Sequence, residues 1–352
     1  GLPENLTALV VIRPSVLTPK ETFEIDQFLC GGGRVVVLYD HESFDLRGSF
    51  ARTEIETGLD DFLNSFGVEV HSPLVYDAQC QSVPAGSQVL TLPNGAQVQV
   101  PLDMPYGFFP ALTGDSLDSE HPVTREISDV TLMWAHPVSL SKSSAGITSR
   151  VLLQSSEDSW TLPSDSSPAL ERSNLELLRA QAAASGLPRA YAVAVALTGL
   201  FPTTFEENPE GVSPEREKIS EGGEGALVVI GDSDLFHDAI LRPGSGNADF
   251  AANLVDWLAG DEALIRLRTR GERNRRLRDF ASEFIEASGG WATTDEENLE
   301  LDRNALAHKR AQQRKIAWLN VLGPGVFVLV AGLLHWRMRE RNARRSYPGG
   351  SE

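Results

Sequence analysis

Cysteine is scarce in this chain of 352 residues, which contains only Cys30 and Cys80. Two cysteines cannot form the dense disulfide framework of a small secreted domain. Neither has a second Cys or a His at the spacing of a zinc site. We therefore expect two free thiols, with a single disulfide between Cys30 and Cys80 as the alternative.

Two sequence motifs that would indicate an enzyme are also absent. The chain has no GxxxxGK[ST] run, so it lacks the P-loop that binds and hydrolyses ATP. It has no G-x-S-x-G elbow either, and the strand expected at residues 34–39 is followed by Asp40, His41 and Glu42 rather than by a cysteine. The sequence therefore does not indicate a hydrolase with a Ser or Cys nucleophile.

Basic residues are few, with 31 Lys and Arg against 49 Asp and Glu, for a net charge of -18. The deficit is uneven, because residues 1–300 hold 21 basic and 46 acidic residues, whereas residues 301–352 hold 10 and 3. An acidic body repels phosphate backbones, so we expect no nucleic-acid partner. The basic end suits the anionic headgroups of a lipid bilayer.

Residues 316–336 form a run of 21 residues without a charge, with basic residues on both sides. A helix of this length can cross a bilayer. Trp318 and Trp336 would lie about 27 Å apart along it, near the two membrane interfaces. Arg337, Arg339 and Arg341 would lie among the headgroups. We predict one transmembrane helix here; the alternative is a buried core helix.

The segments before this run predict a connection between the body and the membrane. Thr294 and Glu297 form a capping box that opens a polar helix at residues 295–315, typical of a solvated stalk. Seven arginines between Arg266 and Arg278 indicate either an edge strand with a solvated face, or contact with lipid headgroups or an acidic partner. The predicted parts are an α/β domain (1–268), an Arg-rich segment and stalk (269–315), the transmembrane helix (316–336) and a basic cytoplasmic tail (337–352).

The body alternates short apolar runs with helical patterns. Runs at residues 9–12, 34–39, 191–197 and 226–230 predict strands, and the capping box of Thr18 and Glu21 opens the first helix. This alternation predicts an α/β fold with one mostly parallel sheet and helices on both faces. Residues 87–101, with a Pro-Asn-Gly turn, predict an inserted β-hairpin, and the Ser-rich residues 141–167 predict surface loops.

Acidic and histidine side chains follow two of the expected strands. Asp40, His41 and Glu42 come after one strand, and Asp232, Asp234 and His237 come after another. In open parallel sheets, ligands bind at the carboxyl ends of the strands, so these six residues are the candidate ligand crevice. They could bind a metal or act as acid and base. The alternative is that the aspartates cap turns and helices.

Several blocks of the sequence resemble one known family. The run from Leu17 to Asp40, with its LTPKE, DQFL and GGGRVVVLYD segments, is similar to the GldG-like auxiliary proteins of ABC-2 type transporters, which are associated with gliding motility. Three further blocks agree, namely GLDDFL at residues 58–63, VIGDSD at 229–234 and NLVDWLAGDE at 253–262. The apolar run with its Arg-rich end fits the same family.

This resemblance implies an amidotransferase-like or flavodoxin-like extracytoplasmic domain, anchored in a bacterial cytoplasmic (inner) membrane. Family members also carry an N-terminal membrane helix, so the chain is expected to be the C-terminal part of a longer protein. The implied partners are an ABC transporter permease and ATPase, with no cofactor. The leading hypothesis is a non-catalytic auxiliary subunit; the alternative is a membrane-tethered hydrolase or metal-dependent enzyme that uses Asp40, His41, Asp232 and Asp234.

Overall fold

The computed structural model describes residues 2–3, 5–45, 50–91, 97–141, 146–220, 222–238, 240–260, 301, 303–315 and 337–338. The chain divides into two compact units, Gly1–Arg273 and Asn274–Glu352. The boundary predicted at residues 268/269 stays a prediction, because residues 261–300 lie outside the described part of the chain.

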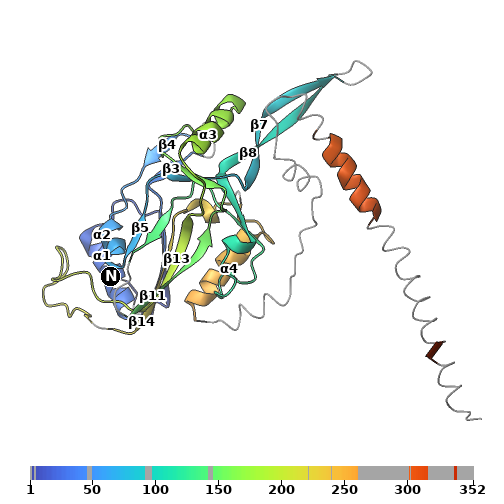
Figure 1. Ribbon diagram of the computed structural model, residues 1–352. Coiled ribbons are helices and arrows are strands. Elements are labelled where there is room, and N and C mark those ends of the chain that lie inside the picture. Colours follow the sequence, from blue (N-terminus) through green and yellow to red (C-terminus); the bar gives the residue numbers. More distant parts are fainter. Residues whose placement is uncertain are drawn as a thin grey trace, which may run out of the picture. The chain divides into compact units, whose positions relative to one another are not determined.

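A five-stranded sheet forms the centre of the first unit, in the order β1-β2-β14-β13-β11 (Figure 1). Strands β1 (Ala8–Ile12), β2 (Arg34–Leu38) and β14 (Glu224–Ile230) run parallel to one another. Strands β13 (Ala192–Leu200) and β11 (Ile147–Gln154) are antiparallel to their neighbours. The four predicted strands therefore share one sheet, but the sheet is mixed.

We expected a mostly parallel sheet of the amidotransferase-like or flavodoxin-like kind. This is wrong for β13 and β11, which are antiparallel to their neighbours. Antiparallel neighbours need no helical crossover, and the described part of the connection from β13 to β14 is an irregular loop. Buried Asp26 holds this loop, accepting hydrogen bonds from the Thr203 hydroxyl at 2.6 Å and the Thr204 backbone N–H at 2.7 Å. The described part of the connection is thus fixed in place without a helix.

The Ser-rich residues 141–167 were expected to be surface loops, and this was wrong. They contain β11 of the central sheet and β12 (Ser159–Leu162). Leu152 and Leu153 of β11 are buried in the core. Burial of these side chains outweighs the turn-forming composition of the segment around them.

Helices cover both faces of the central sheet. Val36 and Leu38 of β2 belong to one core cluster together with α4 (Gly246–Leu258). Val35 and Val37 point the opposite way, into a cluster with α1 (Pro19–Cys30) and α2 (Asp60–Ser65). Successive strand residues alternate between faces, so this all-apolar strand is buried on both sides.

The other elements surround this core. Helix α1 begins with the predicted capping box at Thr18, and α3 is Arg172–Ala184. Short strands pair as β3 (Glu42–Phe44) with β4 (Arg52–Glu54), β5 (Val68–Val70) with β10 (Val138–Leu140), and β6 (Leu74–Asp77) with β12. Two short 3-10 helices are η1 (Gly114–Ser116) and η2 (Asp234–Phe236).

The predicted hairpin is confirmed and is longer than residues 87–101. Strand β7 (Cys80–Thr91) pairs antiparallel with β8 (Gln97–Thr113), and the end of β8 pairs with β9 (Asp129–Thr131). Figure 1 shows the far part of this ribbon extending away from the central sheet. Its base is packed by an aromatic cluster in which Trp134 is stacked on Phe44 and contacts Phe109.

In the second unit, residue 301 and residues 303–315 are helical. They belong to the polar stalk helix predicted at residues 295–315, whose other residues lie outside the described part of the chain. The Arg-rich residues 266–278, the apolar run 316–336, Arg339 and Arg341 lie outside the described residues, whereas Arg337 is described and exposed. None of the described helices combines the length and apolar character that a membrane crossing requires.

Candidate functional site

The candidate residues lie at the carboxyl edge of the three parallel strands. Ile12 of β1 is in register with Leu38 of β2, which is in register with Ile230 of β14. The residues that follow each strand therefore meet at one edge. Arg13 follows β1, Asp40 follows β2, and the Asp232-Ser233-Asp234 segment follows β14.

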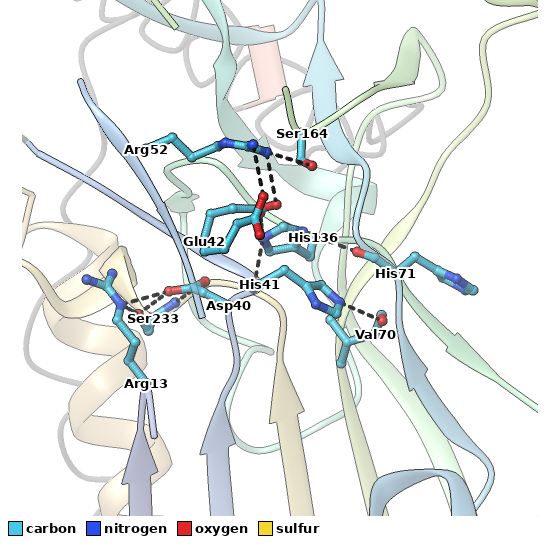
Figure 2. A network of polar contacts seen from close by, with 11 residues as sticks. Arg13, Asp40, His41, Glu42, Arg52, Val70, His71, His136, Ser164 and Ser233 are labelled. Carbon is cyan, nitrogen blue, oxygen red and sulfur yellow. Dashed lines mark hydrogen bonds and ion pairs between the residues drawn. The ribbon is translucent and has the colours of Figure 1, made fainter. Parts of the chain in front are cut away.

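Arg13 connects the ends of all three strands. Its Nε donates to Asp40 Oδ2 at 3.0 Å and to Ser233 Oγ at 2.6 Å, and its guanidinium also forms an ion pair with Asp234. Ser233 in turn donates to Asp40 through its hydroxyl and, at 3.1 Å, through its backbone N–H. Figure 2 shows Arg13, Asp40 and Ser233 pointing toward one another. The carboxylates of Asp40 and Asp234 thus both lie beside the guanidinium of Arg13.

Burial strengthens the electrostatic interactions among Arg13, Asp40 and Asp234. The side chain of Asp40 is 4% exposed, that of Asp234 10% and that of Arg13 29%. Burial acts to lower the pKa of Arg13, but the two carboxylates outweigh it and raise that pKa. Burial also raises the pKa of Asp234, although Arg13 opposes the shift.

Asp232 is fully buried behind this group and serves the backbone. Its two carboxylate oxygens accept hydrogen bonds from the backbone N–H of Met133 at 2.7 Å and of Leu235 at 3.0 Å. Burial raises its pKa well above the usual value, and the charges of Asp40 and Asp234 raise it further. Asp232 therefore fastens the end of β14 to the segment around Met133.

A second polar group begins at the next residues of the chain. His41 donates from its backbone N–H to His136 Nε2 at 3.3 Å, and its own Nε2 lies 3.0 Å from the carbonyl oxygen of Val70. Glu42 Oε2 lies 3.3 Å from His136 Nε2, and Glu42 Oε1 lies 3.6 Å from Arg52. Figure 2 shows these side chains on the side of Asp40 away from Arg13.

The ring of His136 is completely buried, which limits its hydrogen-bonding roles. Its Nδ1 lies 3.1 Å from the carbonyl oxygen of His71, and because a carbonyl can only accept, Nδ1 carries a proton. In this tautomer Nε2 accepts the backbone N–H of His41 and leaves Glu42 Oε2 without a hydrogen bond among the described residues; a proton on Nε2 would provide one. Burial acts to raise the pKa of Glu42, but His136, Ser164 and His41 together outweigh burial and lower that pKa.

Sequence reasoning found part of this edge. Asp40, Asp232 and Asp234 lie together, and His41 and Glu42 lie beside them, whereas His237 is exposed at the end of η2. It missed Arg13, His136, Arg52 and Ser233. Arg13 and Ser233 could have been found, since one follows a predicted strand directly and the other stands between two candidate aspartates. His136 and Arg52 come from segments with no strand prediction, so only the fold brings them in.

The contacts favour the interpretation in which these carboxylates stabilise turns and strand ends. Asp40 and Asp232 are buried and hydrogen-bonded to groups of the chain itself, and Glu42 is buried beside Arg52 and His136 although its Oε2 has no hydrogen-bond partner among the described residues. In the part of the chain that the structure describes, no three His, Cys, Asp or Glu side chains are grouped so that they could hold a metal ion. Its ion pairs and hydrogen bonds hold the ends of β1, β2 and β14 at fixed positions.

Both cysteines are free thiols, as expected. Burial, followed by the charge of Asp26, raises the pKa of Cys30 to about 12. Burial and Asp77 raise the pKa of Cys80 to about 12. At neutral pH both are therefore protonated and poor nucleophiles.

Cys30→Ala should consequently leave biological function intact and cost about 1 kcal/mol of folding stability, since only a small buried group is lost. Urea denaturation measures the stability, and co-purification with partner subunits measures the function. Loss of function in a variant that still folds would contradict this prediction and revive an enzymatic role.

Comparison with known proteins identifies the family to which this chain belongs. The model of the family described as "ABC-type uncharacterized transport system" matches residues 1–258. An uncharacterized protein of Borreliella burgdorferi is 18% identical over 299 residues, which cover 81% of this chain and 51% of the relative. The chain thus spans about half the length of this curated relative. No solved structure matches it. The resemblance found in the sequence is confirmed: this chain belongs to the family of ABC-type uncharacterized transport systems, whose members are auxiliary components of ABC transport.

Proposed function

We propose that the protein is a non-catalytic, membrane-anchored subunit of an ABC-type transport system, whose acidic domain acts outside the cytoplasmic membrane by binding a partner or ligand. One observation carries the non-catalytic part. The carboxyl edge of the sheet, where α/β enzymes place their catalytic groups, is closed here by the contacts among Arg13, Asp40, Ser233 and Asp234.

The alternative, a tethered hydrolase or metal-dependent enzyme using Asp40, His41, Asp232 and Asp234, fits these contacts less well. A general base must reach the proton that it removes. Asp232 is completely buried, and both of its oxygens accept backbone hydrogen bonds. The His41 imidazole is bonded to a backbone carbonyl. Cys30 is buried, and its raised pKa keeps it protonated.

The anchor and orientation rest on the sequence of residues 316–352. The uncharged run 316–336 would cross the inner membrane, Trp318 and Trp336 would lie at its interfaces, and residues 337–352 would lie in the cytoplasm. Without a P-loop the chain needs another subunit to hydrolyse ATP. Permease and ATPase subunits of the same system are therefore its proposed partners.

The test is to co-express residues 1–352 or residues 1–315 with the permease and ATPase of the same transport system, and to purify each chain in mild detergent. We expect the longer chain to resist carbonate extraction from membranes and to retain both subunits, identified by mass. The shorter chain should be released as a soluble acidic protein, because it lacks the apolar run.

Two results would oppose the proposal in different ways. If residues 1–315 still resist extraction, the run at 316–336 is not the anchor. If residues 1–352 are in the membrane but retain neither subunit, the role in a transport complex is wrong. Denaturation curves of both chains serve as the control for folding.

A further inference from the structure

The two outer strands of the central sheet differ in how their free edges are protected. Strand β11 carries Arg150, which forms ion pairs with Asp118 at 2.9 Å and with Glu120 at 3.0 Å. Its register with β13 shifts twice, and Leu117 forms an antiparallel bridge to Leu153 on its outer side. Charge, irregular pairing and a covering segment are devices by which natural sheets prevent another chain from pairing at an edge.

Strand β1, at the opposite edge, has none of these devices among the described residues. It consists of Ala-Leu-Val-Val-Ile, without a charge or a proline, and its register with β2 is unbroken from Ala8 to Ile12. No described strand pairs with its other side. Its five residues are an ordinary strand length, so the edge is not shortened either. An unprotected apolar edge of this kind is a template for a further strand.

The backbone of β1 faces outward at two of its residues. The N–H of Arg13 donates to the carbonyl oxygen of Leu38 in β2 at 3.0 Å. Successive residues of an extended strand alternate in direction, so the N–H groups of Val10 and Ile12 face away from β2. These groups need hydrogen-bond partners, which are either water or the backbone of another strand.

The same two residues expose apolar side chains. Val10 is paired with Val36, and Ile12 is paired with Leu38. Directly paired residues share a face, so Val10 and Ile12 lie on the face of the sheet that α4 covers. Val36 and Leu38 are completely buried there, whereas Val10 is 44% and Ile12 57% exposed. The apolar face of the sheet therefore continues beyond β2, where its side chains are only partly covered.

We propose that β1 is not the outer strand of the working domain, and that a further β-strand of the same polypeptide, from outside residues 1–352, lies beside it. The length of the relative provides a source for this strand, because the 299 matched residues are only 51% of that protein. The added strand would bond to the outward peptide groups of β1, and the chain connected to it would cover Val10 and Ile12. This inference concerns the fold and does not depend on the proposed function.

Other occupants of this edge fit the observations less well. A second copy would bring together two bodies that each carry a net charge of -18. A lipid surface would leave the outward peptide groups of Val10 and Ile12 without hydrogen-bond partners. A separate subunit would leave an apolar edge bare, and prone to aggregation, whenever the subunits are apart. A strand of the same polypeptide covers the edge permanently.

Photo-cross-linking of the complete product of the gene that encodes this chain tests the proposal. p-Benzoylphenylalanine replaces Ile12 at the edge or, as the matched control, Leu177 of α3, which is 54% exposed. Each product is irradiated in its own membrane, and the linked peptides are identified by mass spectrometry. We expect the probe at Ile12 to link within one polypeptide to a residue outside residues 1–352. The probe at Leu177 should give no such link.

A charge at the same edge gives a second measurement on the complete gene product. Val10→Asp would place a carboxylate beneath the added strand and should lower the midpoint of thermal unfolding by about 8 °C or more. Leu177→Asp places the same charge on an exposed helix position and should lower it by less than about 4 °C. Circular dichroism in mild detergent measures both midpoints.

Several results would overturn the proposal. A link from Ile12 to a second copy, to another subunit, to lipid or to a residue within 1–352 would identify a different occupant. If the probe at Ile12 gives no link, or if Val10→Asp is as mild as Leu177→Asp, the edge is free. A complete gene product of no more than 352 residues would leave the added strand without a source.

Discussion

Arg13→Ala should lower the free energy of unfolding by about 3–5 kcal/mol, the cost typical of removing one partner from a buried ion pair. The guanidinium is the cation in contact with both Asp40 and Asp234, and it also donates to Ser233. Without it, two carboxylates that are at most 10% exposed would remain side by side. The ends of β1, β2 and β14 would also lose the side chain that joins them. Urea denaturation followed by circular dichroism measures this loss.

Arg13→Lys provides the matched control. A lysine keeps the positive charge but loses the fork of N–H groups that reaches several acceptors at once. We expect it to be more stable than Arg13→Ala and less stable than the unmodified protein. A loss below about 1 kcal/mol for Arg13→Ala would place the pair in the class of surface salt bridges and remove the argument that this edge is held by charge.

The contacts around Arg13 explain its unusual backbone conformation. Its φ is +42°, in the left-handed region that a non-glycine residue adopts at a cost. Such conformations persist where other contacts hold them, and they are common at functional sites. Here the contacts with Asp40, Ser233 and Asp234 hold the residue. The strain is therefore accounted for by the joining of three strands.

The sequence predicted the elements of this fold better than it predicted how they pair. The capping box at Thr18, the strand at residues 34–39 and the Pro-Asn-Gly hairpin are local signals, and the structure contains all three elements. The direction of β13 has no local signal, because an apolar strand reads the same whether its neighbour is parallel or antiparallel. The prediction therefore assumed a parallel neighbour for β13, whereas β13 and β14 are antiparallel and the described residues between them form an irregular loop.

The candidate site was also predicted where the signals are local, and missed where only the fold brings residues together. Asp40 and Asp232 were placed at one edge because each follows an apolar run within two residues, and those two runs are parallel neighbours in the sheet. His136 reaches Glu42 across 94 residues of sequence, which no periodicity or motif connects. Burial also determines what each carboxylate at this edge does. Whether a carboxylate after a strand faces solvent or a backbone N–H is a property of the packed structure rather than of the sequence.

A double-mutant cycle on Glu42 and His136 should show a coupling energy of about 1–3 kcal/mol at pH 7, in the range measured for residues in direct contact. The two side chains are 4% and 0% exposed, and 3.3 Å separates Oε2 from Nε2. Glu42→Gln removes the charge while keeping the shape. His136→Asn can still donate to the His71 carbonyl from the position of Nδ1 but no longer reaches Glu42. The difference between the double variant and the sum of the single variants isolates their contact.

The same cycle has a pH dependence whose sign follows from the pKa of Glu42. His136 lowers this pKa despite burial, so the folded value lies below the unfolded value, which is about 4.3. A group with a lowered folded pKa stabilises the protein above its unfolded pKa, and this contribution is lost as the pH falls through the folded pKa. Stability curves from pH 7 down to pH 3 should therefore show the coupling energy shrinking below about pH 4. A coupling that does not shrink below about pH 4, or one that stays below about 0.5 kcal/mol over the whole range, would mean that the carboxylate and the imidazole do not stabilise each other.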